Sequence, residues 1–300
     1  MNNLKKNTCI LIDTTFYLYK TYYTFPSLYN KFNEPTGAIY GILNLLNKIL
    51  TQYPTQYIVL IFDSKEPTFR HKIYKKYKSH RLPMPINLRR QIMPIYQIIK
   101  AMGIPNITIP GIEADDIIGT IASYMSKENF FVLISSGDKD MAQLVTNNIN
   151  LLDTNTNSIL GPLEIHNKYG IKPELIIDLI ALMGDKSDNI PGIPGIGKKT
   201  AILLLTKIGN LKQIYHNITI IDTLNIKGSK KITDKLITYK NNALLSYKLA
   251  TIETNISLLK DNNLFKIKKP NITQLYTLFK HYELKQWLKI LTKNNWLTKY

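Results

Sequence analysis

Three short runs of consecutive apolar residues each lead into an aspartate. The runs are Thr8–Ile12 before Asp13, Tyr57–Phe62 before Asp63, and Phe130–Ile134, which reaches Asp138 through a Ser-Ser-Gly turn. Runs of this length, rich in β-branched residues and lacking polar alternation, predict strands that are buried on both faces.

Segments with helical periodicity lie between and around the predicted strands, at 37–50, 88–102 and 114–126. Strands that alternate with helices predict a parallel α/β sheet, and such sheets bind ligands beyond the carboxyl ends of their strands. We therefore predict an α/β fold with a mostly parallel central sheet flanked by helices, in which the three aspartates gather at one edge.

The pattern changes near residue 170, where strand-like runs largely stop and helical patterns take over, as at 173–183 and 200–207. We predict an α/β domain over 1–168, a helical module over 169–262 and a C-terminal helical segment over 263–300. That last segment contains both tryptophans. Because no repeat or low-complexity linker separates the parts, we expect them to pack closely.

The composition is that of a soluble globular protein with a large positive charge. Hydrophobic residues make up 44% of the chain, and 39 Lys and Arg against 21 Asp and Glu give a net charge of +18. No apolar run is long enough to span a membrane, the N-terminus lacks a signal-peptide core, and the single Cys9 excludes an intrachain disulfide. We expect a cytoplasmic, nucleoid-associated monomer.

The charge itself has two explanations. A strongly basic chain favours a nucleic-acid partner. However, only four of the 39 basic residues are arginine, and Ile, Asn, Lys and Tyr are abundant, as AT-rich coding would produce for any function.

Nine of the 21 acidic residues fall into short clusters. Each cluster alone has an ordinary explanation, because acids stabilise a helix N-terminus and aspartates often occupy solvated turns. Together they favour a cation, since two carboxylates about 4 Å apart repel by roughly 4 kcal/mol at an effective dielectric near 20. The predicted metal ligands are Asp13, Asp63, Glu113, Asp115, Asp116, Asp138, Asp140, Asp185 and Asp188.

The ligand chemistry of these acids narrows the choice of ion. Oxygen-only sites suit Mg²⁺, for which Mn²⁺ can substitute, whereas zinc sites use Cys or His, and none of the five His has ligand spacing with the clusters. Two such ions can activate water and stabilise the leaving oxygen of a phosphodiester. We therefore predict two or more Mg²⁺ ions.

Residues 65–81 contain seven Lys and Arg against Glu66 alone. Cationic and aromatic side chains recur in this stretch at helical spacing, as Arg70, Tyr74, Tyr77, Lys78 and Arg81. The spacing predicts one helix face that suits phosphate contact with base stacking, although most charge runs are simply solvated helix faces.

Gly192, Gly197 and Lys198 nearly reproduce the spacing of a P-loop. Two features oppose that interpretation: Lys199 stands where a Ser or Thr would bind Mg²⁺, and the preceding segment is helical rather than a strand. Helix, Gly-Ile-Gly turn and helix instead predict a helix-hairpin-helix that holds duplex DNA by its backbone. Gly195 and Gly197 would let a phosphate approach, beside Lys198 and Lys199.

These motifs resemble the 5′→3′ exonuclease domain of bacterial DNA polymerase I, within the wider flap endonuclease family. The likeness covers nearly all 300 residues, and its matching stretches are Phe62–His71, Tyr77–Arg81, Glu113–Asp116, Gly137–Leu144 and Gly184–Gly197. The resemblance implies a PIN-like 5′ nuclease fold with a helical arch and a helix-hairpin-helix module. Because no polymerase portion follows, we expect a stand-alone nuclease.

The resemblance also implies an activity. It implies a metal-dependent 5′→3′ exonuclease and 5′-flap endonuclease that acts on flaps, nicked or gapped duplexes and duplex 5′ ends, in Okazaki fragment maturation and repair. By the same resemblance, Tyr77, Lys78 and Arg81 would belong to the arch over the scissile phosphate, and a K⁺ ion would lie at the hairpin. A separate DNA polymerase is an expected partner.

Two positions depart from the family pattern. Thr14 follows Asp13 where relatives usually carry glycine, and Lys20 stands where they usually carry arginine. Lysine keeps the charge but loses the two-pronged geometry of a guanidinium group. We expect Lys20 to contact DNA, with a looser hold on a terminal phosphate.

Two other functions stay open. One is a non-catalytic protein that binds flaps or duplex DNA, which should lack a metal ligand, and none is missing. The other is a PIN-like ribonuclease, although such domains usually lack a helical module that holds duplex DNA.

Overall fold

The computed structural model describes residues 7–224, 228–257 and 261–292, and six strands in these residues form one sheet. The strands are β1 (Thr8–Asp13), β2 (Tyr57–Ile61), β3 (Asn106–Ile107), β4 (Phe131–Ser135), β5 (Ile149–Asp153) and β6 (Ser158–Leu160). Their order is β3-β2-β1-β4-β5-β6, and every pair is parallel except β5 with β6. The predicted mostly parallel sheet is confirmed.

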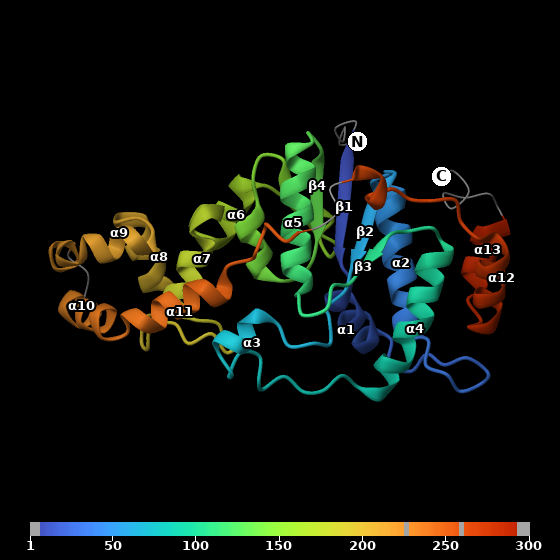
Figure 1. Ribbon diagram of the computed structural model, residues 1–300, viewed down its shortest axis with the longest axis horizontal. Coiled ribbons are helices and arrows are strands. Elements are labelled where there is room, and N and C mark those ends of the chain that lie inside the picture. The colour runs from blue at the N-terminus through green and yellow to red at the C-terminus, as the bar shows by residue number, and fades with distance from the viewer. Residues whose placement is uncertain (1–6, 225–227, 258–260, 293–300) are drawn as a thin grey trace.

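Helices cover both faces of the sheet, as Figure 1 shows. Successive strand residues point to opposite faces, so Leu11 packs in one core with α5 (Ala114–Lys127). Ile10 packs in the other core with α2 (Gly37–Gln52) and α4 (Ile86–Ala101). Burial on both faces explains why the strands carry apolar runs without alternation.

The basic stretch departs from its prediction. The helix α3 covers only Phe69–Ile73, and the chain then runs through turns and an extended segment to α4. At Lys78 the backbone φ is 52°, in the left-handed region that a right-handed helix excludes. The predicted continuous helix through Arg70 and Arg81 is therefore wrong, and the expected arch is helical only over α3. We call residues 65–85 the arch segment.

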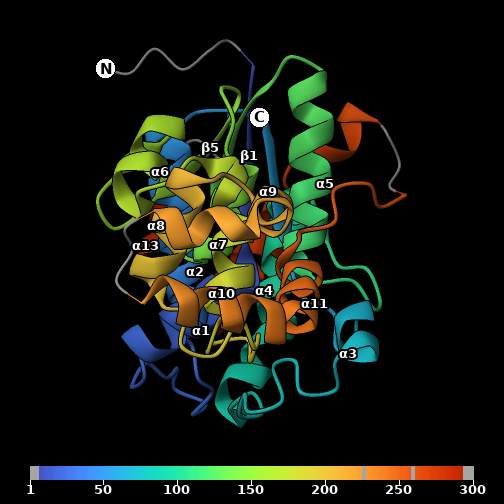
Figure 2. The same ribbon diagram turned by 90° about the vertical axis from the view of Figure 1, so that its left-hand side faces the viewer.

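A helical module follows the sheet and extends along the long axis of the molecule, as Figure 1 shows. Its elements are α6 (Pro162–Tyr169), η2 (Pro173–Leu175), α7 (Ile176–Met183), α8 (Lys198–Lys207), α9 (Leu211–His216), η3 (Ile218–Thr223), α10 (Ser229–Thr238) and α11 (Lys240–Ala250). Figure 2, which looks down that axis, shows α11 beside α3. One hydrophobic core runs continuously from the sheet into α7 and α11.

The C-terminal segment returns to the sheet. After η4 (Asn262–Phe265), the Ile267 amide donates to the Gln56 carbonyl, and α12 (Ile272–His281) packs on α4. Trp287 of α13 (Lys285–Thr292) is fully buried in the core of α2 and α4. The second tryptophan and the remaining predicted helix, 293–300, lie outside the described residues. Among the helices described, none has the length and apolarity to cross a membrane.

Candidate active site

Three neighbouring strands bring their aspartates to one edge of the sheet. Asp13 ends β1, and Asp63 and Asp138 follow β2 and β4. Ser136 joins two of them, because its hydroxyl donates to Asp13 at 2.8 Å and accepts from the Asp138 amide at 3.0 Å. Asp63 accepts from the amide of Ala114 at 2.8 Å, which attaches the start of α5 to the same edge. The edge predicted from the sequence thus exists.

The start of α5 sends its acids in different directions. Asp115 is half-buried, and desolvation together with the charges of Asp138 and Asp13 raises its pKa. Asp116 turns away and binds Arg70 through two hydrogen bonds, Nη1 to Oδ2 and Nη2 to Oδ1, each 2.7 Å. Arg70 and Asp116 are 2% and 1% exposed. This pair opposes two predictions, because Arg70 is buried rather than open to DNA and both oxygens of Asp116 are already engaged by Arg70.

Burial and like charge act together to raise the pKa of Asp13 and of Asp140. Burial raises the pKa of Asp13 to about 7, with further contributions from Asp63 and Asp138. Burial and the charges of Asp138 and Asp185 raise the pKa of Asp140 to about 8. These shifts place acids from both modules in one electrostatic cluster.

The donor set fits a divalent cation. Oδ1 of Asp140 is buried and has no hydrogen-bond partner, which is costly unless an ion or another donor meets it. The ligand atoms available are carboxylate oxygens, the type that Mg²⁺ and Mn²⁺ prefer. In the described residues, no three acids already surround a single point as a preformed metal cage. Several of them instead pair with lysine or arginine.

The arch segment supplies two of those cations. Lys78 donates to Glu113 at 2.8 Å and lies 3.6 Å from Asp188, while Arg81 binds the other oxygen of Asp188. Tyr77 is 3% exposed, and its hydroxyl donates to Glu113 at 3.1 Å. Burial raises the pKa of Glu113, but the charges of Lys78 and Arg70 outweigh burial and lower it to about 2. The proposed phosphate contacts and metal ligands therefore touch each other.

Asp185 and Asp188 reach the site from the helical module. They stand in a turn closed by backbone bonds between Asp185 and Ile190. Asp185 binds Lys139 at 2.7 Å, and the carbonyl of Asp188 accepts from the Lys78 amide at 3.0 Å. The turn thus attaches the helical module to both the sheet edge and the arch segment.

The hairpin between α7 and α8 presents a helix N-terminus. Gly197 caps α8, and a Cβ built on it would meet no atom within 4 Å. Lys198 and Lys199 are exposed in the first turn. Gly195 has φ of 77° and lies against the amine of Lys235. Free N–H groups and cations at one helix start form the arrangement that binds a phosphate.

Lys20 and Tyr74 occupy different surroundings. Lys20 lies at a cavity of about 150 Å³ that reaches Asp138 and Lys168, and its amine donates to Asn155 at 2.6 Å. Tyr74 is half-buried and packs against the core. Lys20 therefore lies near the acids, whereas Tyr74 packs the arch segment against the hydrophobic core.

Three polar residues of the site were missed in the sequence. Ser136 and Lys139 flank Asp138 along the chain, so their position beside a strand end was an available signal. Thr68 donates to Glu113 at 2.8 Å across a long sequence separation, which no local pattern reveals.

Two family models match consecutive parts of the chain. The model described as 5′-3′ exonuclease, N-terminal resolvase-like domain, covers residues 8–170. The model described as 5′-3′ exonuclease, C-terminal SAM fold, covers residues 171–273.

Curated relatives agree with these matches. A 5′-3′ exonuclease of Buchnera aphidicola subsp. Baizongia pistaciae is 49% identical over 98% of this chain and 97% of its own length. DNA polymerase I of Pseudomonas aeruginosa is 42% identical over 95% of this chain, which spans 31% of that longer protein.

Solved structures share the fold at low identity. The T5 D15 protein co-crystallized with metal ions has a TM-score of 0.68 at 19% identity, over 95% of this chain and 98% of that one. The catalytic core of Rad2 in complex with a DNA substrate has a TM-score of 0.64 at 18% identity, over 96% and 92%. With both family models and the Buchnera relative covering it, the chain belongs to the 5′-3′ exonuclease family.

Proposed function

We propose that this chain is a divalent-metal-dependent nuclease that hydrolyses DNA at 5′ flaps, nicks, gaps and duplex 5′ ends. The observation that carries the proposal is the cluster of carboxylates around the sheet edge, two of which, Glu113 and Asp188, directly contact the cations of the arch segment. The name of the curated relative at 49% identity supports a 5′→3′ direction.

Eight of the nine predicted acids remain proposed metal ligands. Asp116 is left out because Arg70 engages both of its oxygens. The other eight are Asp13, Asp63, Glu113, Asp115, Asp138, Asp140, Asp185 and Asp188. Mg²⁺ is the proposed ion, because the donors are all oxygen. When bound, such ions activate water and neutralise charge that develops on the phosphate.

The chain's own residues position the substrate. Lys78 and Arg81 are proposed to leave Glu113 and Asp188 and donate to the scissile phosphate, where a charge-assisted hydrogen bond is strong. Tyr77 is buried and donates to Glu113, and it is proposed to hold the arch segment in position over the acids. Lys20 is proposed to contact DNA beside Asp138.

The helical module is proposed to hold the duplex. Gly197 leaves space for a phosphate, Gly195 lies beside the amine of Lys235, and Lys198 and Lys199 add charge at the start of α8. Flap removal during Okazaki fragment maturation and repair is the proposed role, with a separate DNA polymerase supplying the substrate.

A 5′-flap duplex labelled at either end tests the proposal. With Mg²⁺ we expect the flap to be released as one oligonucleotide near the junction, and a recessed 5′ end to be shortened stepwise. No cleavage in Mg²⁺ or Mn²⁺, with flap binding intact, would favour the non-catalytic alternative. Preferential cleavage of the same flap made of RNA would favour the ribonuclease.

A further inference from the structure

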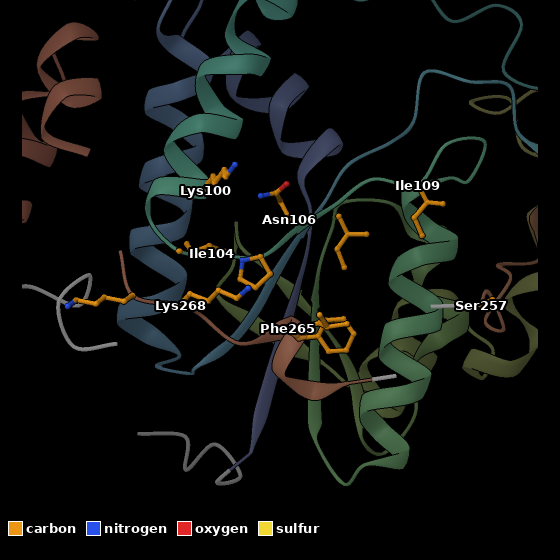
Figure 3. Close-up of a pocket in the computed structure, with 12 residues that line it drawn as sticks. Lys100, Ile104, Asn106, Ile109, Ser257, Phe265 and Lys268 are labelled. Carbon is orange, nitrogen blue, oxygen red and sulfur yellow. The ribbon is translucent and has the colours of Figure 1, made fainter. Parts of the chain in front are cut away.

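A groove of about 680 Å³ lies at the outer edge of the sheet, beside β3. Its residues come from the end of α4, from β3 and the segments on either side of it, from Ser257, and from η4 with the segment that follows. Figure 3 shows Ile104, Ile109 and Phe265 around it, with Lys100 and Lys268 also drawn. None of the eight proposed metal ligands and no arch-segment residue lines it.

The floor and walls of the groove are apolar. Ile104 and Phe265 are 2% and 3% exposed, and Ile107 and Ile109 are half-buried. Leu264 keeps 38% of its surface exposed at the mouth. An exposed apolar patch with a charged or polar rim is typical of a site that binds another molecule.

The rim is positively charged. Lys100, Lys268 and Lys269 are all exposed, and none of the described residues that line the groove is acidic. Asp261, at the start of η4, already accepts from the amide and side chain of Asn263, at 2.9 and 3.0 Å. An occupant with carboxylates on either side of an apolar centre would complement this surface.

The strand at the groove has one free side. β3 pairs only with β2, to which the carbonyls of Pro105 and Ile107 are bonded. No strand of the described chain lies on the other side of Asn106. The edge of a sheet can accept an extended peptide through main-chain hydrogen bonds, with alternate side chains entering pockets.

We propose that this groove binds an extended segment of a partner protein, with apolar residues at alternate positions and Asp or Glu at its flanks. The apolar residues fill the space between Ile109 and Phe265. The acidic flanks pair with Lys100 on one side and with Lys268 and Lys269 on the other. The backbone of the segment runs along β3 at Asn106.

A display experiment tests the proposal without knowing the partner. Random dodecapeptides on phage are selected on the full chain and counter-selected on a Leu264→Asp variant, which places a repelling carboxylate at the mouth. We expect the surviving peptides to share two or three apolar residues at alternate positions, with Asp or Glu beside them. No variant-sensitive peptides, or peptides that lack either feature, would overturn the proposal.

One selected peptide is then synthesised with a fluorophore and measured by anisotropy. Lys100→Glu with Lys268→Glu should weaken its binding at least tenfold, whereas Lys280→Glu with Lys285→Glu, on α12 and α13, should change it less than threefold. An equal loss of peptide affinity in both double variants would mean that the peptide binds by nonspecific charge attraction, and it would overturn the proposal. Flap cleavage should be unchanged in the groove variants, so the result is independent of the proposed nuclease function.

Discussion

Lys78 of the arch segment donates to Glu113 at 2.8 Å, so a residue proposed to bind the phosphate is held by a residue proposed to bind metal. The same arrangement recurs between Arg81 and Asp188. We propose that bound metal takes the acid of each pair and that bound DNA takes the cation. These ion pairs allow the effects of substitutions on cleavage and on stability to be predicted.

Replacing Lys78 with Ala should slow cleavage roughly 10²- to 10³-fold, the usual effect of removing one donor from a transition-state oxyanion. The affinity for a flap should change far less. Single-turnover rates and binding titrations separate the two effects. Lys75→Ala, an exposed lysine of the same segment, is the matched control. Equal rate losses in both variants would mean that only the total charge of the segment matters.

Asp138→Asn and Asp116→Asn should fail in different ways. Asp138→Asn should abolish cleavage, because Asp138 is a proposed metal ligand. The protein should stay folded and bind DNA, because the substitution relieves repulsion among the clustered carboxylates. Asp116→Asn should lower the free energy of unfolding by about 3–5 kcal/mol, since it leaves the buried charge of Arg70 without its partner. Urea unfolding and a cleavage assay distinguish the two. A stable but inactive Asp116→Asn would return Asp116 to the metal site.

Removing divalent metal should destabilise the protein measurably. Mg²⁺ at 100 times its dissociation constant adds about 2.7 kcal/mol by mass action. Asp140→Asn removes the cost of burying this carboxyl among other acids, whether it is charged or protonated, so the chelated variant should melt higher than the chelated parent and gain less from Mg²⁺. Thermal melts in chelator and in Mg²⁺ measure both effects. A lower melting temperature of the variant in chelator would contradict the electrostatic explanation.

The stability should depend on pH through Asp178 of α7. Its side chain is buried and accepts from the Leu211 amide at 2.8 Å; burial raises its pKa despite that bond. A raised pKa means that the folded state binds the proton more tightly. This contribution is therefore complete below the unfolded pKa of about 3.9 and is lost as pH rises through the folded pKa.

Asp178→Asn provides the comparison, because the amide keeps an acceptor for Leu211 and does not ionise. Relative to this variant, the parent should become less stable as pH rises from about 4 to 7. Urea unfolding at several pH values gives the difference directly. A difference that is independent of pH, or that changes in the opposite direction, would contradict the assigned shift.

Duplex binding should weaken steeply with salt. About six phosphate contacts give a slope near −5 in a plot of log affinity against log salt concentration. Lys198→Ala with Lys199→Ala should make that slope shallower by about 2, whereas Lys280→Ala on α12 should leave it unchanged. An unchanged slope in the double variant would remove the hairpin from the DNA interface.

The sequence predicted the parts of this structure that depend on local pattern. Buried strands such as Thr8–Asp13 carry unbroken apolar runs, and the position of Asp13 at the end of one followed from sheet geometry. β3, β5 and β6 were not predicted; β3 and β6 are very short and only half-buried. Short strands are held by their neighbours in the sheet rather than by their own composition.

The arch segment shows where local pattern fails. Helical spacing placed Arg70 and Lys78 on one predicted helix face. Tertiary contacts instead fix the position of each residue, because Arg70 binds Asp116 and the Lys78 amide donates to the carbonyl of Asp188. These partners come from distant parts of the chain. Charge and spacing predicted a surface for phosphate contact, but not that one cation is buried against Asp116 and another contacts Glu113.

Arg70 has a wider consequence than its pairing with Asp116. Its guanidinium also donates to the carbonyls of Leu249 and Thr251, at the end of α11, so one side chain joins the arch segment, α5 and the helical module. Because the hydrophobic core also continues across residue 170, we expect the two family domains to unfold together. A lineage that lost or exchanged either half would expose that core, and the two halves are therefore expected to be inherited together.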